Sequence, residues 1–136
     1  SDVYKRQDLL VRGNCSLITG VPGVSDTIRI NGIIDRYLEH SRIFIFANGG
    51  DEKMFIGSAD WMPRNLDNRV EVITPVYDSR IKEDLWKVID FGLRGNCQGS
   101  VVDGSGKNCL WTTDTEESFR SQEELYKYYK SHITND

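Results

Sequence analysis

Short blocks of apolar residues alternate with polar ones along the chain, and their spacing predicts a succession of strands and helices. The run Leu9-Leu10-Val11 suits a buried strand that leads into Arg12. A helix is expected to begin after Ser25 or Asp26 and to end just before His40. Five apolar residues with the spacing i, i+3, i+4, i+7 and i+8 define its expected buried face: Ile30, Ile33, Ile34, Tyr37 and Leu38.

The middle of the chain predicts a β-hairpin. Residues 42–47 are largely apolar at consecutive positions, which is typical of a strand covered on both faces in the middle of a sheet. Asn48-Gly49-Gly50-Asp51 supplies a turn, and residues 53–58 are expected to return as the paired strand. A further strand is expected over residues 69–74, ended by Pro75.

Two helices are expected in the second half of the chain. The first covers about residues 79–93, with apolar residues on one face, and the second begins at the capping box Ser121-Gln122-Glu123-Glu124. Between them, the glycine-rich residues 95–116 are expected to form a mobile loop. The order of elements predicts the α/β class, with a mixed sheet and helices packed on its faces.

Composition narrows the class of protein. The chain has 136 residues, the size of one domain, and its 38% hydrophobic and 28% charged residues are typical of a globular protein. Seventeen Lys and Arg against 21 Asp and Glu give a net charge of −4, which argues against a nucleic-acid binder. No apolar run is long enough to cross a bilayer. Three cysteines without a CxxC pair argue against a structural zinc site, and we expect no metal ligands.

The first residues differ from the rest. Residues 1–7 (SDVYKRQ) have no apolar period and resemble a translated sequencing adapter fused to an open reading frame. We therefore expect residues 1–7 to be a non-native leader and residues 8–136 to form the domain. The alternative is that residues 1–7 are a frayed native N-terminus.

His40 is the most informative titratable residue. A neutral-range pKa and a nucleophilic ring nitrogen suit histidine to phosphoryl chemistry. The hairpin register is expected to bring Ser58 and Asp60 back beside His40 and Arg42. One interpretation is that His40 only caps the expected helix. The other is catalytic, because His-x-Arg followed by Gly57-Ser58-x-Asp60 resembles the HxK…GSxN signature of the phospholipase D superfamily, with Arg for Lys and Asp for Asn.

A longer resemblance accounts for those departures. Five segments resemble, in order and spacing, the C-terminal domain of polyphosphate kinase, and the strong match covers about residues 9–76. The segments are Val11-Arg12-Gly13, Gly20-Val21-Pro22-Gly23, Ile34 to Arg42 (IDRYLEHSR), Asn48-Gly49-Gly50-Asp51 and Gly57 to Asp67 (GSADWMPRNLD). The resemblance implies a phospholipase-D-like half and reversible transfer of the terminal phosphate of ATP to polyphosphate.

The resemblance also implies site residues. Arg12 and His40 match the family's nucleotide and phosphate site, with His40 as a supporting acid/base or phosphate stabiliser. A guanidinium is a forked donor for phosphate oxygens, and an imidazole can protonate or stabilise a developing phosphate anion. Arg42, Ser58 and Arg64 are expected to extend the phosphate lining. Arg69 could widen it as well, although Arg64 and Arg69 could instead pair with Asp67 or Glu71.

The family resemblance implies partners as well. They are ATP or ADP, polyphosphate, Mg²⁺ carried with ATP, the preceding domains of a longer enzyme, and a second copy in a homo-oligomer. The location implied is the cytoplasm, peripheral to the inner face of the membrane. The family's phosphorylated histidine lies in the preceding domain, so the isolated chain is expected to be an inactive fragment. Two alternatives stay open: phospholipase-D-like phosphodiester hydrolysis, and a non-catalytic phosphate-binding module.

Overall fold

A computed structural model describes residues 6–13, 15–103, 105, 107, 109–114 and 117–133. The chain divides into two compact units, Ser1–Glu39 with Val88–Asp136 (unit 1) and His40–Lys87 (unit 2). Most of the expected leader, residues 1–5, lies outside the described residues, whereas Gln7 is already part of a strand.

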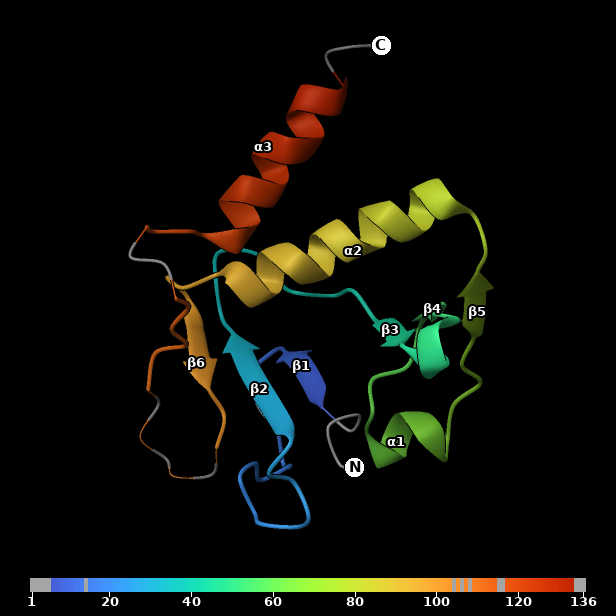
Figure 1. Ribbon diagram of the computed structural model, residues 1–136. Helices are drawn as coiled ribbons and strands as arrows, with labels where there is room; N and C mark the ends of the chain where they lie inside the picture. The colour runs from blue at the N-terminus through green and yellow to red at the C-terminus, as the bar shows by residue number, and fades with distance from the viewer. Residues whose placement is uncertain are drawn as a thin grey trace. The chain divides into compact units, whose positions relative to one another are not determined.

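Unit 1 contains a three-stranded mixed sheet (Figure 1). Strand β2 (Ile28–Ile33) is central; it pairs in parallel with β1 (Gln7–Val11) and antiparallel with β6 (Gly99–Val101). The expected α/β class with a mixed sheet is confirmed. In β2, Ile30 is 1% exposed and Asn31 is fully enclosed, so the core of unit 1 lies along this strand.

The prediction of a helix between Ser25 and His40 is wrong. Residues 28–33 form β2, and residues 34–42 have no helix. The apolar spacing of Ile30, Ile33 and Ile34 fits a helix, but Ile28 and Ile30 also alternate with polar residues as in a strand. Pairing with β1 and β6 on both sides supplies the hydrogen bonds that select the strand. His40 therefore has no preceding helix to cap.

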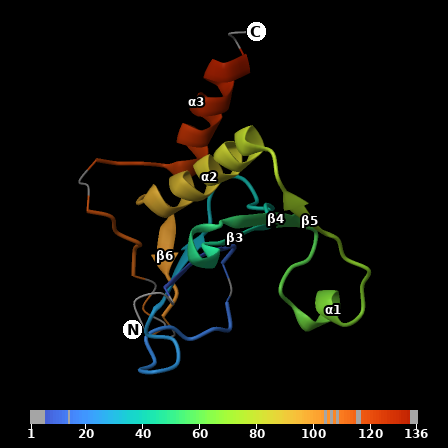
Figure 2. The same ribbon diagram turned by 45° about the vertical axis from the view of Figure 1, so that its right-hand side comes forward.

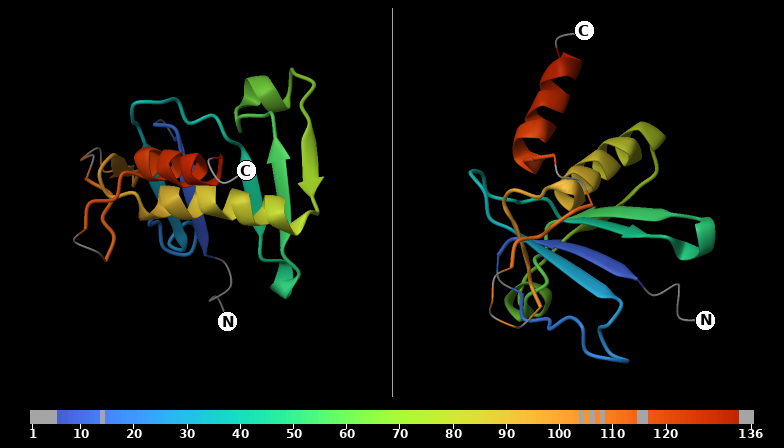
Figure 3. Two further views of the ribbon diagram at one scale, coloured as in Figure 1. Left: turned by 90° about the horizontal axis from the view of Figure 1, so that it is seen from above. Right: turned by 60° about the vertical axis from the view of Figure 1, so that its left-hand side comes forward.

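Two helices complete unit 1, of which the first is shared with unit 2. Helix α2 (Ser79–Arg94) agrees with the expected 79–93, and α3 (Ser121–Ile133) begins at the expected capping box. The last turns of α2 pack on the sheet at Gly92, where an added Cβ would lie 2.5 Å from Leu10 Cδ1. Phe91 contacts Phe119 and Tyr128 edge to face, at 5.4 and 5.9 Å between ring centroids, and joins α2 to α3. Figure 3 shows that α3 begins near the last turns of α2.

Unit 2 is built on a three-stranded antiparallel sheet with the order β3-β4-β5 (Figure 2). The strands are β3 (Ile43–Phe46), β4 (Lys53–Gly57) and β5 (Ile73–Val76), with the 3₁₀ helix η2 (Asn48–Gly50) in the hairpin turn. The expected hairpin is confirmed. In the turn Asn48, Gly49 and Gly50 all have positive φ, which glycine adopts without strain.

Two details of this sheet differ from expectation. β3 lies at the edge and β4 in the centre, so the apolar run over residues 42–47 does not mark a central strand. β5 begins four residues later than expected and includes Pro75. Among the described strands β5 pairs with β4 alone, and proline is compatible with such an edge strand because some of its backbone positions need no partner.

The segment expected to be a mobile loop, 95–116, contains regular structure in its described part. β6 lies within it, and Ser100 forms an isolated antiparallel bridge with Leu110. Among the described residues, no helix is both long enough and apolar enough to cross a membrane.

Candidate functional site

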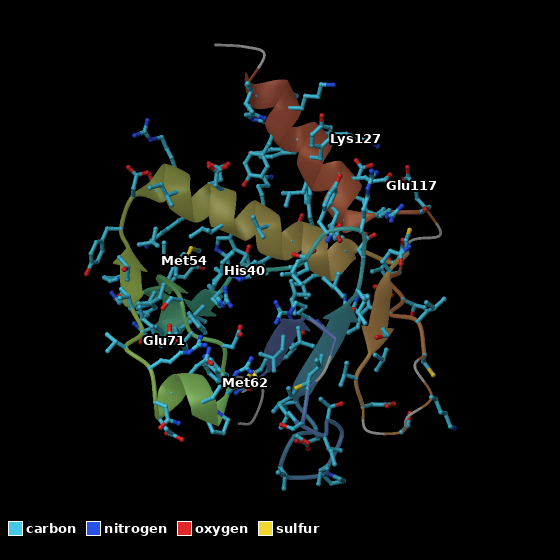
Figure 4. All side chains as sticks on the ribbon, turned by 180° about the vertical axis from the view of Figure 1, so that it is seen from behind. His40, Met54, Met62, Glu71, Glu117 and Lys127 are labelled. Carbon is cyan, nitrogen blue, oxygen red and sulfur yellow. The ribbon has the colours of Figure 1, made fainter. Side chains whose placement is uncertain are left out.

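His40 and Arg42 lie in the segment that leads into β3, and their geometry is set by the hairpin. The Gly57 N–H donates to the Arg42 carbonyl oxygen at 3.0 Å, so the chain after β4 passes beside the start of β3. Asp60 thereby comes within reach of Arg42. The expected juxtaposition of His40, Arg42 and Asp60 is present within unit 2. His40 is labelled in Figure 4.

The Arg42 guanidinium makes contacts in two directions. Its Nε and Nη2 donate to Oδ1 of Asp60 at 3.1 and 2.9 Å. Its Nη1 donates to the His40 carbonyl oxygen at 2.8 Å, and lies 2.9 Å from Nδ1 and 3.3 Å from Nε2 of the His40 ring. The Arg42 side chain is 16% exposed, whereas His40 is an exposed residue. The exposed His40 imidazole is thus in contact with the largely buried guanidinium of Arg42.

Ser58 has different partners from those expected. Its hydroxyl donates to a carboxylate oxygen of Glu71 and accepts from the Val72 N–H at 3.0 Å. The Ser58 N–H also donates to the Val72 carbonyl oxygen at 3.0 Å. Glu71 is a site residue that sequence reasoning treated only as an ion-pair partner for arginine. The pairing register of β4 and β5 brings Glu71 to Ser58. The sequence could not predict this register, because it did not predict the position of β5.

Arg64 and Arg69 are exposed and lie between β4 and β5, Arg64 within the short helix α1 (Pro63–Leu66) and Arg69 after it. Within the part of the chain that the structure describes, neither forms an ion pair with Asp67 or Glu71. Both guanidinium groups are available to solvent anions. They remain candidates for a phosphate lining in unit 2.

Arg12 lies in unit 1, directly after β1, and its side chain is exposed. The next residue, Gly13, has φ +78°, a conformation that favours glycine, and turns the chain there. An added Cβ on Gly13 would meet Ile34 Cδ1 at 3.5 Å. Arg12 and His40 belong to different units, and their shared role in one nucleotide and phosphate site stays a prediction.

The segment before His40 is fixed to the start of α3. Arg120 binds the Asp35 carboxylate through Nε and Nη2, with distances of 2.5–3.2 Å, and the Asp35 side chain is 1% exposed. Hydrogen bonding from Arg120, opposed by desolvation, holds the pKa of Asp35 below its usual value. Gln122 binds the main chain of Tyr37 and the carboxylate of Glu39. Sequence reasoning missed these contacts, because no local pattern links positions about 85 residues apart.

Among the described residues, no group of three or more His, Cys, Asp or Glu side chains is arranged to hold a metal ion. The three cysteines are free thiols. The described carboxylates therefore do not form a protein cage for Mg²⁺.

Known proteins resemble this chain over most of its length. Residues 5–122 match the family Polyphosphate kinase C-terminal domain 2. Polyphosphate kinase from Escherichia coli K12 is 44% identical over 124 residues, which cover 91% of this chain. The enzyme from Salmonella typhimurium LT2 is 43% identical over 124 residues. The match covers 18% of the length of each of these two relatives.

The fold agrees with a solved structure of the same family. The crystal structure of polyphosphate kinase from Porphyromonas gingivalis has a TM-score of 0.88 and 40% sequence identity, and the match covers 96% of this chain and 20% of that one. The family match spans more than half of the chain, and the fold agrees over nearly all of it. This chain belongs to the Polyphosphate kinase C-terminal domain 2 family.

Proposed function

We propose that this chain supplies part of the nucleotide and phosphate site for reversible transfer of the terminal phosphoryl group between ATP and inorganic polyphosphate. The observation that carries the proposal is the exposed His40 imidazole, which contacts Arg42, itself bound by Asp60, within a segment that matches the polyphosphate kinase family. An exposed imidazole on a fixed support can donate to, or protonate, a phosphate oxygen.

The basic residues have separate roles in this proposal. Arg12 binds nucleotide phosphate through its forked donors, and Arg64 adds positive charge on the loop after β4. Arg42 and Ser58, which the sequence placed in the phosphate lining, already have carboxylate partners in Asp60 and Glu71. They act mainly on the geometry of the site and less as direct phosphate ligands.

Mg²⁺ enters with the nucleotide. This ion keeps several of its waters and is usually bound by substrate phosphates plus one or two carboxylates, so no cage of protein ligands is required. Its role is to neutralise phosphate charge. The residues of this chain orient the phosphate and move a proton at His40.

The remaining partners belong to a longer enzyme. The nucleophilic histidine that carries the phosphoryl group lies in a preceding domain, and the assembled enzyme is a cytoplasmic homo-oligomer, peripheral to the inner face of the membrane. The isolated chain then binds ATP or polyphosphate weakly, through exposed charges that salt screens.

A chimera tests this function. The matching segment of the Escherichia coli K12 enzyme, 44% identical to this chain, is replaced by this chain, and ATP-dependent polyphosphate synthesis is measured. We expect activity within about tenfold of the parent, together with ADP formation in step with polymer. A folded chimera that binds ATP but makes no polymer would contradict the proposal. Hydrolysis of a phosphodiester without ATP would support the phosphodiesterase alternative instead.

A further inference from the structure

The sheet of unit 2 is apolar on both of its faces. In the strands Ile43–Phe46 and Lys53–Gly57, apolar side chains occupy consecutive positions, and successive side chains of a strand point to opposite sides. An antiparallel sheet with one face toward water usually alternates apolar with polar residues instead. The pattern therefore indicates that both faces of this sheet are covered in the complete protein.

Among the described residues, one of the two faces is enclosed. Met54 and Val76, which are paired across β4 and β5, are 1% and 8% exposed. Residues 79–87 of α2 belong to unit 2, and Figure 1 shows this part of the helix passing over the sheet. In Figure 4, Met54 lies between the sheet and α2. The chain therefore covers this face with its own helix.

The opposite face carries a cluster of apolar side chains, which we call the aromatic face. The ring of Trp61 stacks on Phe44, with 5.8 Å between the ring centroids and 18° between the planes. Phe46 contacts Phe55 edge to face, at 6.0 Å between the centroids. The register of the strands adds two residues of β5 to this face. The aromatic face comprises Phe44, Phe46, Phe55, Trp61, Ile73 and Pro75.

The aromatic face is open to solvent in the described part of the chain. Trp61 is 74% exposed although one side of its ring lies on Phe44, and Phe46 and Ile73 are 54% and 56% exposed. Ile73 belongs to the same cluster as Phe44, because an added Cβ on Gly57 would lie 3.2 Å from Phe44 Cε2 and 3.4 Å from Ile73 Cγ1. Folded monomers rarely expose large contiguous apolar patches, and such patches mark interaction surfaces.

The relatives indicate which polypeptide is available to cover this face. The match covers 18% of the Escherichia coli K12 enzyme and 20% of the Porphyromonas gingivalis chain, so most of each protein lies outside the matched segment. The aromatic face also adjoins the candidate site, because Asp60, which binds Arg42, is followed directly by Trp61. An element packed on this face would therefore lie next to residues that contact His40.

We propose that the aromatic face is the docking surface for a part of full-length polyphosphate kinase outside the matched segment, through the apolar side of an amphipathic helix. Helices cover the faces of mixed α/β sheets, and their apolar side chains recur at positions i, i+3, i+4 and i+7. Exposed aromatic rings offer large apolar areas to such a helix. The docking surface does not depend on the chemistry of His40, whereas its place beside a phosphate site rests on the proposed function.

Photo-crosslinking in the chimera identifies the occupant. Phe46 is replaced by p-benzoylphenylalanine, the protein is irradiated, and cross-linked peptides are identified by mass spectrometry. We expect cross-links within one molecule to the Escherichia coli part of the chimera, in a peptide whose apolar residues have helical spacing. Cross-links confined to residues 1–136, a cross-linked dimer, or no cross-link at all would each overturn the proposal.

Two isoleucines of the same sheet give a matched pair of variants. Ile73 lies on the aromatic face, and Ile56 lies on the face of Met54, which this chain encloses itself. Ile73→Ser should leave the melting temperature of the isolated chain close to that of the parent and lower the melting temperature of the chimera. Ile56→Ser should lower both. If Ile73→Ser lowers both alike, the face is covered within this chain, and if it lowers neither, the face stays open; either result would refute the docking surface.

These measurements are separate from the test of the proposed function, because neither depends on phosphoryl transfer. A chimera that gives the expected cross-links but makes no polyphosphate would contradict the proposed function alone. An active chimera without cross-links from position 46 to its Escherichia coli part would contradict the docking surface alone.

Discussion

The side-chain amide of Gln122 binds the main chain of Tyr37 on both of its polar groups. Its Oε1 accepts from the Tyr37 N–H at 2.9 Å, and its Nε2 donates to the Tyr37 carbonyl oxygen at 2.8 Å. The same Nε2 lies 2.7 Å from a carboxylate oxygen of Glu39. In this irregular segment of unit 1, the Tyr37 N–H and carbonyl oxygen are therefore hydrogen-bonded by a glutamine side chain of α3, as a neighbouring strand would bond them.

Removing this amide should loosen the segment locally. Gln122→Ala leaves the Tyr37 N–H and carbonyl without their partner, at about 0.5–1.5 kcal/mol for each lost hydrogen bond. We expect faster hydrogen exchange at the Tyr37 amide and little change in the strand amides of β2. Gln122→Glu is the matched variant, because it retains the acceptor for Tyr37 N–H and loses the donor. Equal Tyr37 exchange rates in the parent and in Gln122→Ala would contradict this assignment.

The Asp35–Arg120 pair should make stability depend on acid pH. Arg120 lowers the pKa of Asp35 in the folded chain, so the unfolded chain binds the proton more readily. The stabilisation is complete above the ordinary pKa of aspartate, about 3.9, and is lost as the pH falls through the lowered folded pKa. The free energy of unfolding, measured with urea at a series of pH values, should fall less steeply with decreasing pH in Asp35→Asn than in the parent.

The control for that slope is Asp51→Asn. The pKa of Asp51 is also lowered, by a hydrogen bond from Lys53, but both side chains are exposed, so the pair contributes little. The free energy of unfolding of Asp51→Asn should therefore change with pH as it does in the parent. Identical slopes in the parent and in Asp35→Asn would show that the Arg120 pair does not set the acid response.

The isolated chain should not become phosphorylated by ATP. Transfer through a phosphohistidine needs a nucleophilic ring that attacks phosphorus, and in this account that ring belongs to another domain. His40 has a supporting role in the proposed function, and His132 lies on α3 with its ring centroid 4.3 Å from that of Tyr128. The purified chain is incubated with labelled ATP and magnesium, and acid-labile phosphoprotein and polymer are quantified. Strong labelling of either histidine would show that the chain has its own nucleophile.

Periodic patterns predicted the elements whose partners are close in sequence. The hairpin of β3 and β4 follows from Asn48-Gly49-Gly50-Asp51, and α2 and α3 follow from their apolar faces and the cap at Ser121. A helix was predicted in place of β2 because the spacing of Ile30, Ile33 and Ile34 fits the period of a helix, while Ile28 and Ile30 also fit that of a strand. Only its pairing with β1 and β6, the latter about 70 residues away, decides between them.

The contacts of the candidate site also include some that the sequence could predict and some that it could not. The juxtaposition of His40, Arg42 and Asp60 depends on the hairpin register and could be predicted. The Ser58–Glu71 contact could not, because the expected strand over residues 69–74 was out of position by four residues at its start. Contacts of Arg120 with Asp35 and of Gln122 with Tyr37 come from the tertiary fold alone.

The role of His40 is tested most directly by comparing two alanine variants of the chimeric kinase. His40→Ala should lower kcat for polyphosphate synthesis by about 10²–10⁴-fold, the range expected for a group that transfers a proton. The fold should be retained, because His40 is exposed and adds little to the core. His132→Ala, the matched control, should stay within about threefold of the parent. If His40→Ala also stays within about threefold, or if His132→Ala has the larger effect, the account of this site is wrong.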